Sequence, residues 1–157
     1  MEYTINHVQY LFDELVKHLI VLSLDKDDQT ELFRHGPSGY ALGVELDTYY
    51  TLQKRHYLRH SLLNEEQVGQ MDKLEEYVQK RMGKAHKSFW DKAPRHPGWD
   101  KVRLLARDCL KALEKEDWGI RVKYEYIKIY FEGREQWDGN GSASIRLVQP
   151  GKEDSAF

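Results

Sequence analysis

The period of the hydrophobic pattern changes once along this chain, at Gly119, and that change limits the fold more than any other feature. Before it, apolar residues recur every three or four positions, the spacing of one face of a helix. After it, the residues from Ile120 to Tyr126 alternate between apolar and polar, the period of a half-buried strand. Helices followed by strands favour an α+β fold.

Two helices are predicted near the start of the chain. Asn6 followed by Gln9 matches a capping box, and the apolar stripe behind it predicts a helix over about 7–24. The next stretch has aspartates at its start and Gly36 at its end. It therefore predicts a short helix over 25–36.

The segment from 40 to 62 admits two interpretations. Its first seven residues alternate in hydrophobicity, as a short strand would, and a helix beginning in the same place is the competing interpretation. We prefer Asp47 as the N-cap of a helix over about 48–62.

A longer helix is predicted to begin at Asn64, where Gln67 completes another capping box. Its apolar stripe runs at least to Met82. The helix either ends at Gly83, which suits a helix C-terminus, or continues to about Trp90.

Prolines separate this helix from the last one. The segment 91–98, DKAPRHPG, cannot continue a helix and is predicted to be a loop. Asp100 is expected to cap the last helix, which ends at Gly119. Cys109 lies on its apolar stripe, and because a single cysteine cannot form an internal disulfide, we expect it to fill the core.

The C-terminal third is predicted to be an antiparallel β-hairpin or a three-stranded meander, following four to five helices. The apolar phase shifts by one residue after Tyr126, as a β-bulge would cause. Turn-forming residues occupy 138–142, and the apolar residues from Ile145 to Val148 predict the returning strand. An isolated hairpin is marginal in water, so these strands are expected to lie on the helices.

The chain of 157 residues suits one domain, which we place at 1–149 with a polar tail at 150–157. The most apolar run is far shorter than the roughly 20 residues of a membrane span, so no membrane association is expected. The N-terminus has no basic segment or cleavage site of a secretory signal, which favours the cytoplasm.

Opposite charges are segregated along the sequence. Residues 1–53 carry three basic and nine acidic side chains, whereas residues 54–111 carry fourteen basic and eight acidic ones. The two parts could face each other in the fold, or the basic part could contact a partner. Its densest section, Lys80–Arg107, holds nine Lys and Arg against Asp91 and Asp100.

Within this section the placement of two cations is informative. Lys101 and Arg103 fall in the first turn of the last helix, where cations are locally unfavourable and would strengthen the attraction for anions. Trp90 and Trp99 flank the proline loop, either as exposed anchors or, as we prefer, pinning the loop to the core. The predicted contact residues are Lys84, Lys87, Trp90, Arg95, His96, Trp99, Lys101 and Arg103.

Two histidines form the sharpest local pattern. His56 and His60 are four residues apart on a predicted helix, a spacing that lets two imidazoles share a metal ion. No third ligand is identified by the sequence, so this stays an alternative. We expect no bound metal and no cofactor, because no nucleotide-binding or metalloprotease motif is present.

The same stretch also resembles the short motif of the HEPN ribonucleases, helical dimers that cleave RNA through a paired Arg and His. Arg55 to His60 has the R-x4-H spacing, with a polar residue after the arginine. The resemblance implies that His60 is the acid or base and that Arg55 stabilises the phosphate charge. The resemblance covers only these six residues, and the same spacing recurs from Arg81 to His86.

The sequence predicts a binding protein more readily than an enzyme. Short one-domain chains without a catalytic set are typical of bacterial immunity and inhibitor proteins, so we expect a small intracellular protein whose partner is another protein. The basic, aromatic-flanked stretch would supply its contact surface. The alternative is a nucleic-acid-binding protein or a HEPN-like ribonuclease that needs no metal. The sequence does not indicate an oligomeric state.

Overall fold

A computed structural model describes residues 4–125, 128–131, 134–137 and 142–151 of the chain. The helical part precedes the strands, which confirms the predicted α+β class. Its helices are α1 (Ile5–Ser23), α2 (Lys26–His35), α3 (Gly39–Leu46), the π-helical turn η1 (Asp47–Thr51), α4 (Lys54–Arg59), α5 (Glu65–Gln79), the 3-10 turn η2 (Lys84–His86), α6 (Lys87–Asp91) and α7 (Gly98–Ala112). The strands are β1 (Gly119–Glu125), β2 (Lys128–Phe131), β3 (Arg134–Trp137) and β4 (Ser142–Val148).

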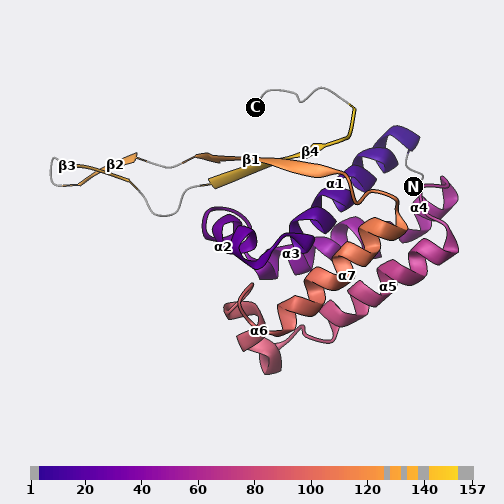
Figure 1. Ribbon diagram of the computed structural model, residues 1–157, viewed down its shortest axis with the longest axis horizontal. Coiled ribbons are helices and arrows are strands. Elements are labelled where there is room, and N and C mark those ends of the chain that lie inside the picture. Colours follow the sequence, from indigo (N-terminus) through magenta and orange to yellow (C-terminus); the bar gives the residue numbers. More distant parts are fainter. Residues whose placement is uncertain (1–3, 126–127, 132–133, 138–141, 152–157) are drawn as a thin grey trace.

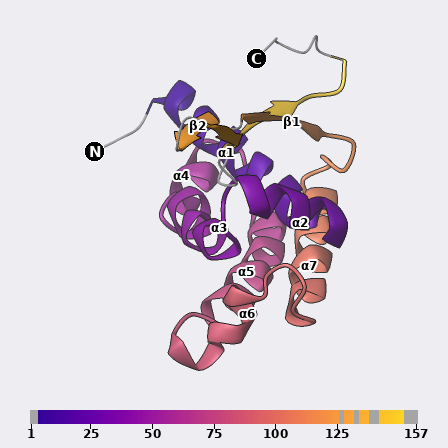
Figure 2. The ribbon, with the colours of Figure 1, turned by 90° about the vertical axis from the view of Figure 1, so that its left-hand side faces the viewer.

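Helix α1 lies at the centre of the hydrophobic core. It packs along α7, α7 packs along α5, and the strands β1 and β4 cross above α1 (Figure 1). This position explains why the apolar stripe of α1 is wide, since Val8, Leu15 and Leu19 are fully buried among neighbours on several sides. The ends of α5 and α7 that lie next to α6 are farthest from the strands (Figures 1 and 2).

The strands form a nested hairpin and no three-stranded meander among the described residues. β1 pairs with β4 in antiparallel register, with Val122 opposite Ile145, and β2 pairs with β3. The β2–β3 pair extends the ribbon beyond the helices (Figure 1). The predicted hairpin is therefore confirmed and the meander is wrong, because the first strand pairs with the last and the second strand pairs with the third. The bulge expected after Tyr126, the turn expected over 138–141 and the tail residues 152–157 lie outside the described residues.

The segment 40–46 is helical, so the strand considered for it is wrong. Ser38 caps α3, its side chain accepting a hydrogen bond from the backbone of Ala41 at 3.0 Å. Asp47 is not an N-cap, because the chain continues from α3 into η1 without leaving the helical region. The helical part is therefore divided into more pieces than the four or five expected.

Three other helix boundaries test the predicted caps. The capping box of Asn64 and Gln67 is confirmed, with reciprocal hydrogen bonds of 2.8 and 2.9 Å. The caps predicted at Asn6 and Asp100 are wrong. Thr4 caps α1, with its hydroxyl accepting from the backbone of His7 at 3.2 Å, and α7 begins directly after Pro97.

Helix α5 ends at Gln79, and the chain turns at Gly83, whose φ of 109° favours glycine. The continuous helix considered up to Trp90 is therefore wrong. Lys80, Lys84 and Lys87 consequently do not share one helix face. None of the helices in the described ranges is long and apolar enough to cross a membrane.

Candidate functional site

The two tryptophans that flank the proline loop face inward. Trp99 is 1% exposed and its indole N–H donates to the carbonyl of Phe89 at 3.0 Å. Trp90 is half-buried and donates to the carbonyl of Arg81 at 2.7 Å. Both indoles pack on α3, where a Cβ added at Gly43 would approach Trp90 within 2.6 Å. These contacts hold the loop to the core.

Arg103, predicted as a contact residue, is also buried. Its guanidinium donates to the side-chain oxygen of Gln29 at 2.8 Å, to the carbonyl of Pro94 at 3.2 Å and to the carboxylate of Asp100. Gln29 in turn donates to two carbonyls at the end of α1. Because α7 begins at Gly98, Arg103 lies in its second turn rather than in the predicted first turn, and its charge has internal partners.

The remaining predicted contact residues lie mainly at the surface. Lys84, Lys87, Arg95 and Lys101 are exposed, and Lys87 forms an ion pair with Asp91 at 3.3 Å. His96 is half-buried, and its Nδ1 accepts a hydrogen bond from the backbone of Gly98 at 2.9 Å. The predicted set thus divides into core residues and surface cations.

Cations from α5, from the residues just after it and from α7 meet in a groove between α5 and α7. The groove has a volume of about 390 Å³ and is lined by Lys73, Glu76, Tyr77, Lys80, Arg81, Lys101 and Leu105. Helix α5 contributes Lys73, Glu76 and Tyr77, the residues just after it contribute Lys80 and Arg81, and α7 contributes Lys101 and Leu105. We call this feature the basic groove.

Tyr77 and Arg81 give the basic groove a fixed wall. The Tyr77 hydroxyl donates to the carbonyl of Gly98 at 2.9 Å, which ties α5 to the start of α7. The Arg81 guanidinium lies 3.4 Å from the centre of the Tyr77 ring and donates to the Tyr77 carbonyl at 2.9 Å. In the described part of the chain, no ion pair neutralises Lys73, Lys80 or Lys101.

Of the cations that line this groove, only Lys101 is among the predicted contact residues, and Lys73, Lys80 and Arg81 are not. The available signal is spacing, because Lys73, Tyr77, Lys80 and Arg81 recur at intervals of three and four residues and so share one face of a helix. That face becomes a groove wall only when α7 lies beside it.

Among the residues of the alternative catalytic and metal predictions, Arg55 and His56 lie on α4 and His60 directly follows it, at the opposite end of α5 from α6 (Figure 1). Arg55 is exposed, His60 is half-buried and His56 is buried. Burial, and next the charge of Arg55, lower the pKa of His56. Among the described residues, no three His, Cys, Asp or Glu side chains gather as a metal site requires.

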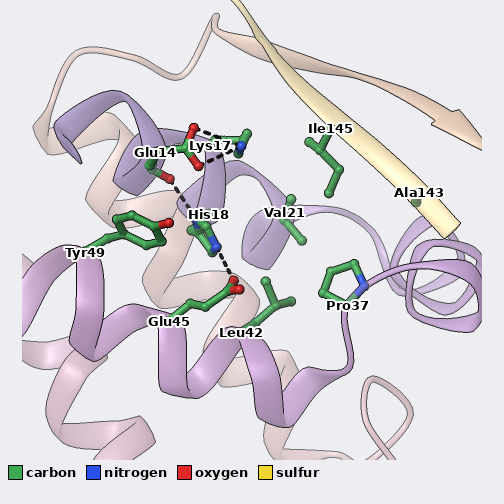
Figure 3. Close-up of a pocket in the computed structure, with 10 residues that line it drawn as sticks. All are labelled: Glu14, Lys17, His18, Val21, Pro37, Leu42, Glu45, Tyr49, Ala143 and Ile145. Atoms are coloured by element: carbon green, nitrogen blue, oxygen red, sulfur yellow. Dashed lines mark hydrogen bonds and ion pairs between the residues drawn. The ribbon is translucent and has the colours of Figure 1, made fainter. Parts of the chain in front are cut away.

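A second concave feature lies between α1, α3, η1 and β4 (Figure 3). It is a cavity of about 250 Å³. Its lining residues are Glu14, Lys17, His18, Val21, Pro37, Leu42, Glu45, Tyr49, Ala143 and Ile145. We call it the His18 cavity, because this histidine lies at its centre and is largely buried (Figure 3).

Both ring nitrogens of His18 have partners. Nδ1 lies 2.7 Å from the backbone carbonyl of Glu14, which can only accept, so Nδ1 carries a proton. Nε2 contacts the carboxylate of Glu45 on α3. The Tyr49 ring lies beside the imidazole, with ring centres 4.9 Å apart. These contacts fix the orientation of the imidazole and hold α1 to α3.

Sequence analysis also missed the His18 cavity. Glu14, Lys17 and His18 lie on one face of α1, and Glu45 and Tyr49 are four residues apart, so both halves could have been identified as polar faces of helices. The contact between these two faces could not be predicted, because it depends on how α3 crosses α1.

Comparisons of this chain with models of known protein families, with curated proteins and with solved structures found no match.

Proposed function

We propose that this protein binds another protein, in the manner of an inhibitor or immunity protein, and that the basic groove receives an acidic part of that partner. The observation that carries the proposal is the convergence of Lys73, Lys80, Arg81 and Lys101, from α5, the residues just after it and α7, around one groove with a single carboxylate, Glu76. Like charges brought together cost free energy in the isolated protein, and an acidic partner would relieve that cost.

The shape of the groove supports a protein partner over a nucleic acid. Besides its charged residues, the groove is lined by Tyr77 and the buried Leu105, and Leu104, which precedes Leu105 on α7 and does not line the groove, is 48% exposed. An apolar patch beside cations suits a protein surface with mixed contacts. Binding of single-stranded nucleic acid commonly uses exposed aromatic rings for stacking, and Trp99 is instead buried and Trp90 half-buried.

The partner should be sought by affinity purification from native cells with two matched double variants. Lys80→Glu with Lys101→Glu reverses two charges of the basic groove. Lys26→Glu with Lys111→Glu makes the same change in net charge at exposed positions that do not line it. We expect the groove variant to lose the partner and the control variant to retain it.

The measurement that separates the two classes of partner is binding affinity against salt concentration, with and without nuclease treatment. A complex with a protein partner should survive nuclease treatment. The partner should bind the groove variant at least about tenfold more weakly than the unmodified protein, chiefly through slower association. A nuclease-sensitive complex with a steep salt dependence would instead identify nucleic acid as the ligand. If both double variants bind the partner as the unmodified protein does, the basic groove is not the contact surface.

The ribonuclease alternative has its own test. RNA cleavage that is lost in His60→Ala and in Arg55→Ala would support it, whereas absence of cleavage by the unmodified protein would exclude it.

A further inference from the structure

The His18 cavity has a polar end and an apolar end. Glu14, Lys17, His18, Glu45 and Tyr49 supply the polar end, and the remaining lining residues are apolar (Figure 3). A cavity of about 250 Å³ corresponds to about eight water molecules at roughly 30 Å³ each. It therefore suits a small molecule with one polar head and a short apolar body.

Lys17 and His18, the basic residues of the polar end, already have partners. Lys17 contacts both carboxylate oxygens of Glu14, at 2.8 and 3.0 Å. His18 uses one nitrogen for the Glu14 carbonyl and the other for Glu45. His18 therefore has no nitrogen left to donate to an anionic ligand, and the Lys17 charge is balanced.

Acceptor capacity, by contrast, remains at Glu45. Only one of its carboxylate oxygens contacts His18, and the side chain is 42% exposed. A carboxylate can accept about four hydrogen bonds, so the second oxygen is available to a donor in the cavity. The Tyr49 hydroxyl lies at the same end and can also accept (Figure 3).

Tyr49 lies near two carboxylates of the cavity. Burial, and then the nearby carboxylates of Glu14 and Glu45, raise the pKa of Tyr49 above its usual value near 10. Burial disfavours any charged group at this position, and only the two carboxylates favour a positive group beside Tyr49. Tyr49 is held there by η1, a π-helical turn, and such turns occur frequently at functional sites.

We propose that the His18 cavity binds a small primary amine, with the ammonium group between the Glu45 carboxylate and the Tyr49 hydroxyl. The alkyl stem lies against Val21, Leu42 and Ile145, which line the apolar end. An ammonium group has three donors and no acceptor, so it matches a site whose spare groups are acceptors. This binding is independent of the basic groove, which lies between α5 and α7.

The test uses n-butylamine as the probe, with butyrate and 1-butanol as the anionic and neutral analogues. Binding is measured by titration while the backbone amide NMR signals of the intact protein are recorded. We expect n-butylamine to shift the signals of residues around the cavity in a saturable manner. Butyrate and butanol should bind at least about tenfold more weakly, because neither offers a charged donor to Glu45.

Two variants locate the bound amine. Glu45→Gln should weaken n-butylamine binding at least about tenfold, since it removes the charged acceptor. Tyr49→Phe keeps the ring and removes only the hydroxyl, so it should weaken binding severalfold without depending on the His18 contact. Glu31→Gln removes an exposed carboxylate of α2 that does not line the cavity, and it should bind as the unmodified protein does.

Three results would overturn the proposal. The first is absence of saturable n-butylamine binding, and the second is binding of butyrate or butanol as tight as that of n-butylamine. The third is unchanged affinity in both folded Glu45→Gln and folded Tyr49→Phe. The charge reversals at Lys80 and Lys101 should leave amine binding unchanged, so failure here and failure of the proposed protein binding are distinguishable.

Discussion

Replacement of Arg103 by alanine should destabilise the protein strongly, because this arginine, which the sequence predicts to contact a partner, is buried in the structure. Its side chain is 7% exposed and joins α7 to the loop and to Gln29. Arg103→Ala leaves the Gln29 side-chain oxygen and the Pro94 carbonyl without their donor. Both acceptors are buried, and Gln29 is fully so.

The expected loss follows from these two acceptors. Each unpaired buried acceptor costs about 1–3 kcal/mol, and entry of water into the vacated space reduces that cost. The Asp100 carboxylate is 77% exposed, so its ion pair adds little. We expect a decrease of about 3 kcal/mol in the free energy of unfolding, which is a large part of the about 5–15 kcal/mol of a typical domain. The melting temperature should fall by about 6–12 °C.

Urea unfolding followed by circular dichroism and tryptophan fluorescence measures this change. Lys101→Ala is the matched control, because it removes a neighbouring exposed cation of the same helix turn and should change stability by less than about 0.5 kcal/mol. Arg103→Lys should recover only part of the loss, since one ammonium group cannot reproduce the guanidinium geometry. Equal stability of Arg103→Ala and Lys101→Ala would refute the structural role of Arg103.

Two further predictions concern the core. Gly43→Ala places a Cβ 2.6 Å from the Trp90 ring, so it should lower the free energy of unfolding by about 1–3 kcal/mol and alter tryptophan emission. Gly69→Ala is the control, because the added Cβ has open space around it in α5 and should stabilise the protein slightly. Burial raises the pKa of the Cys109 thiol to about 12, so DTNB at pH 8 should label the native protein only as fast as it unfolds. The Cys109 thiol of the unfolded chain loses its proton at a lower pH than the buried thiol does, so the free energy of unfolding should fall as pH rises above about 9. Cys109→Ala should remove this pH dependence. Rapid labelling of the native protein, or destabilisation by Gly69→Ala equal to that by Gly43→Ala, would contradict these accounts.

Local patterns were sufficient for several elements whose decisive contacts are local, although they misplaced the caps of α1 and α7. The capping box of Asn64 and Gln67 joins residues three apart, and the structure contains it as predicted. The alternation from Ile120 onward predicted a strand whose inner face packs toward the helices, and Ile120, Val122 and Tyr124 are half-buried there. The returning strand at Ile145 was also identified, since its own alternation shows the same period.

Local patterns failed where packing chose between conformations of similar cost. Residues 40–46 alternate like a strand, yet they form α3 because Gly39 and Gly43 leave space for the Trp99 and Trp90 rings. The same packing buries these tryptophans, which the sequence allowed either to face a partner or to hold the loop. Neither outcome depends on neighbours within one helical turn.

The sequence by itself determined the α+β class, the order of the elements and the concentration of positive charge after residue 54. Each of these follows from residue type and from spacing along one element. Only the tertiary structure decided which charges are available to a ligand. Arg103 is buried because Gln29, 74 positions earlier, accepts its hydrogen bond, and Lys101 joins the basic groove because α5 lies beside α7. The His18 cavity exists because α3 crosses α1 and places Glu45, 27 positions away, against the imidazole.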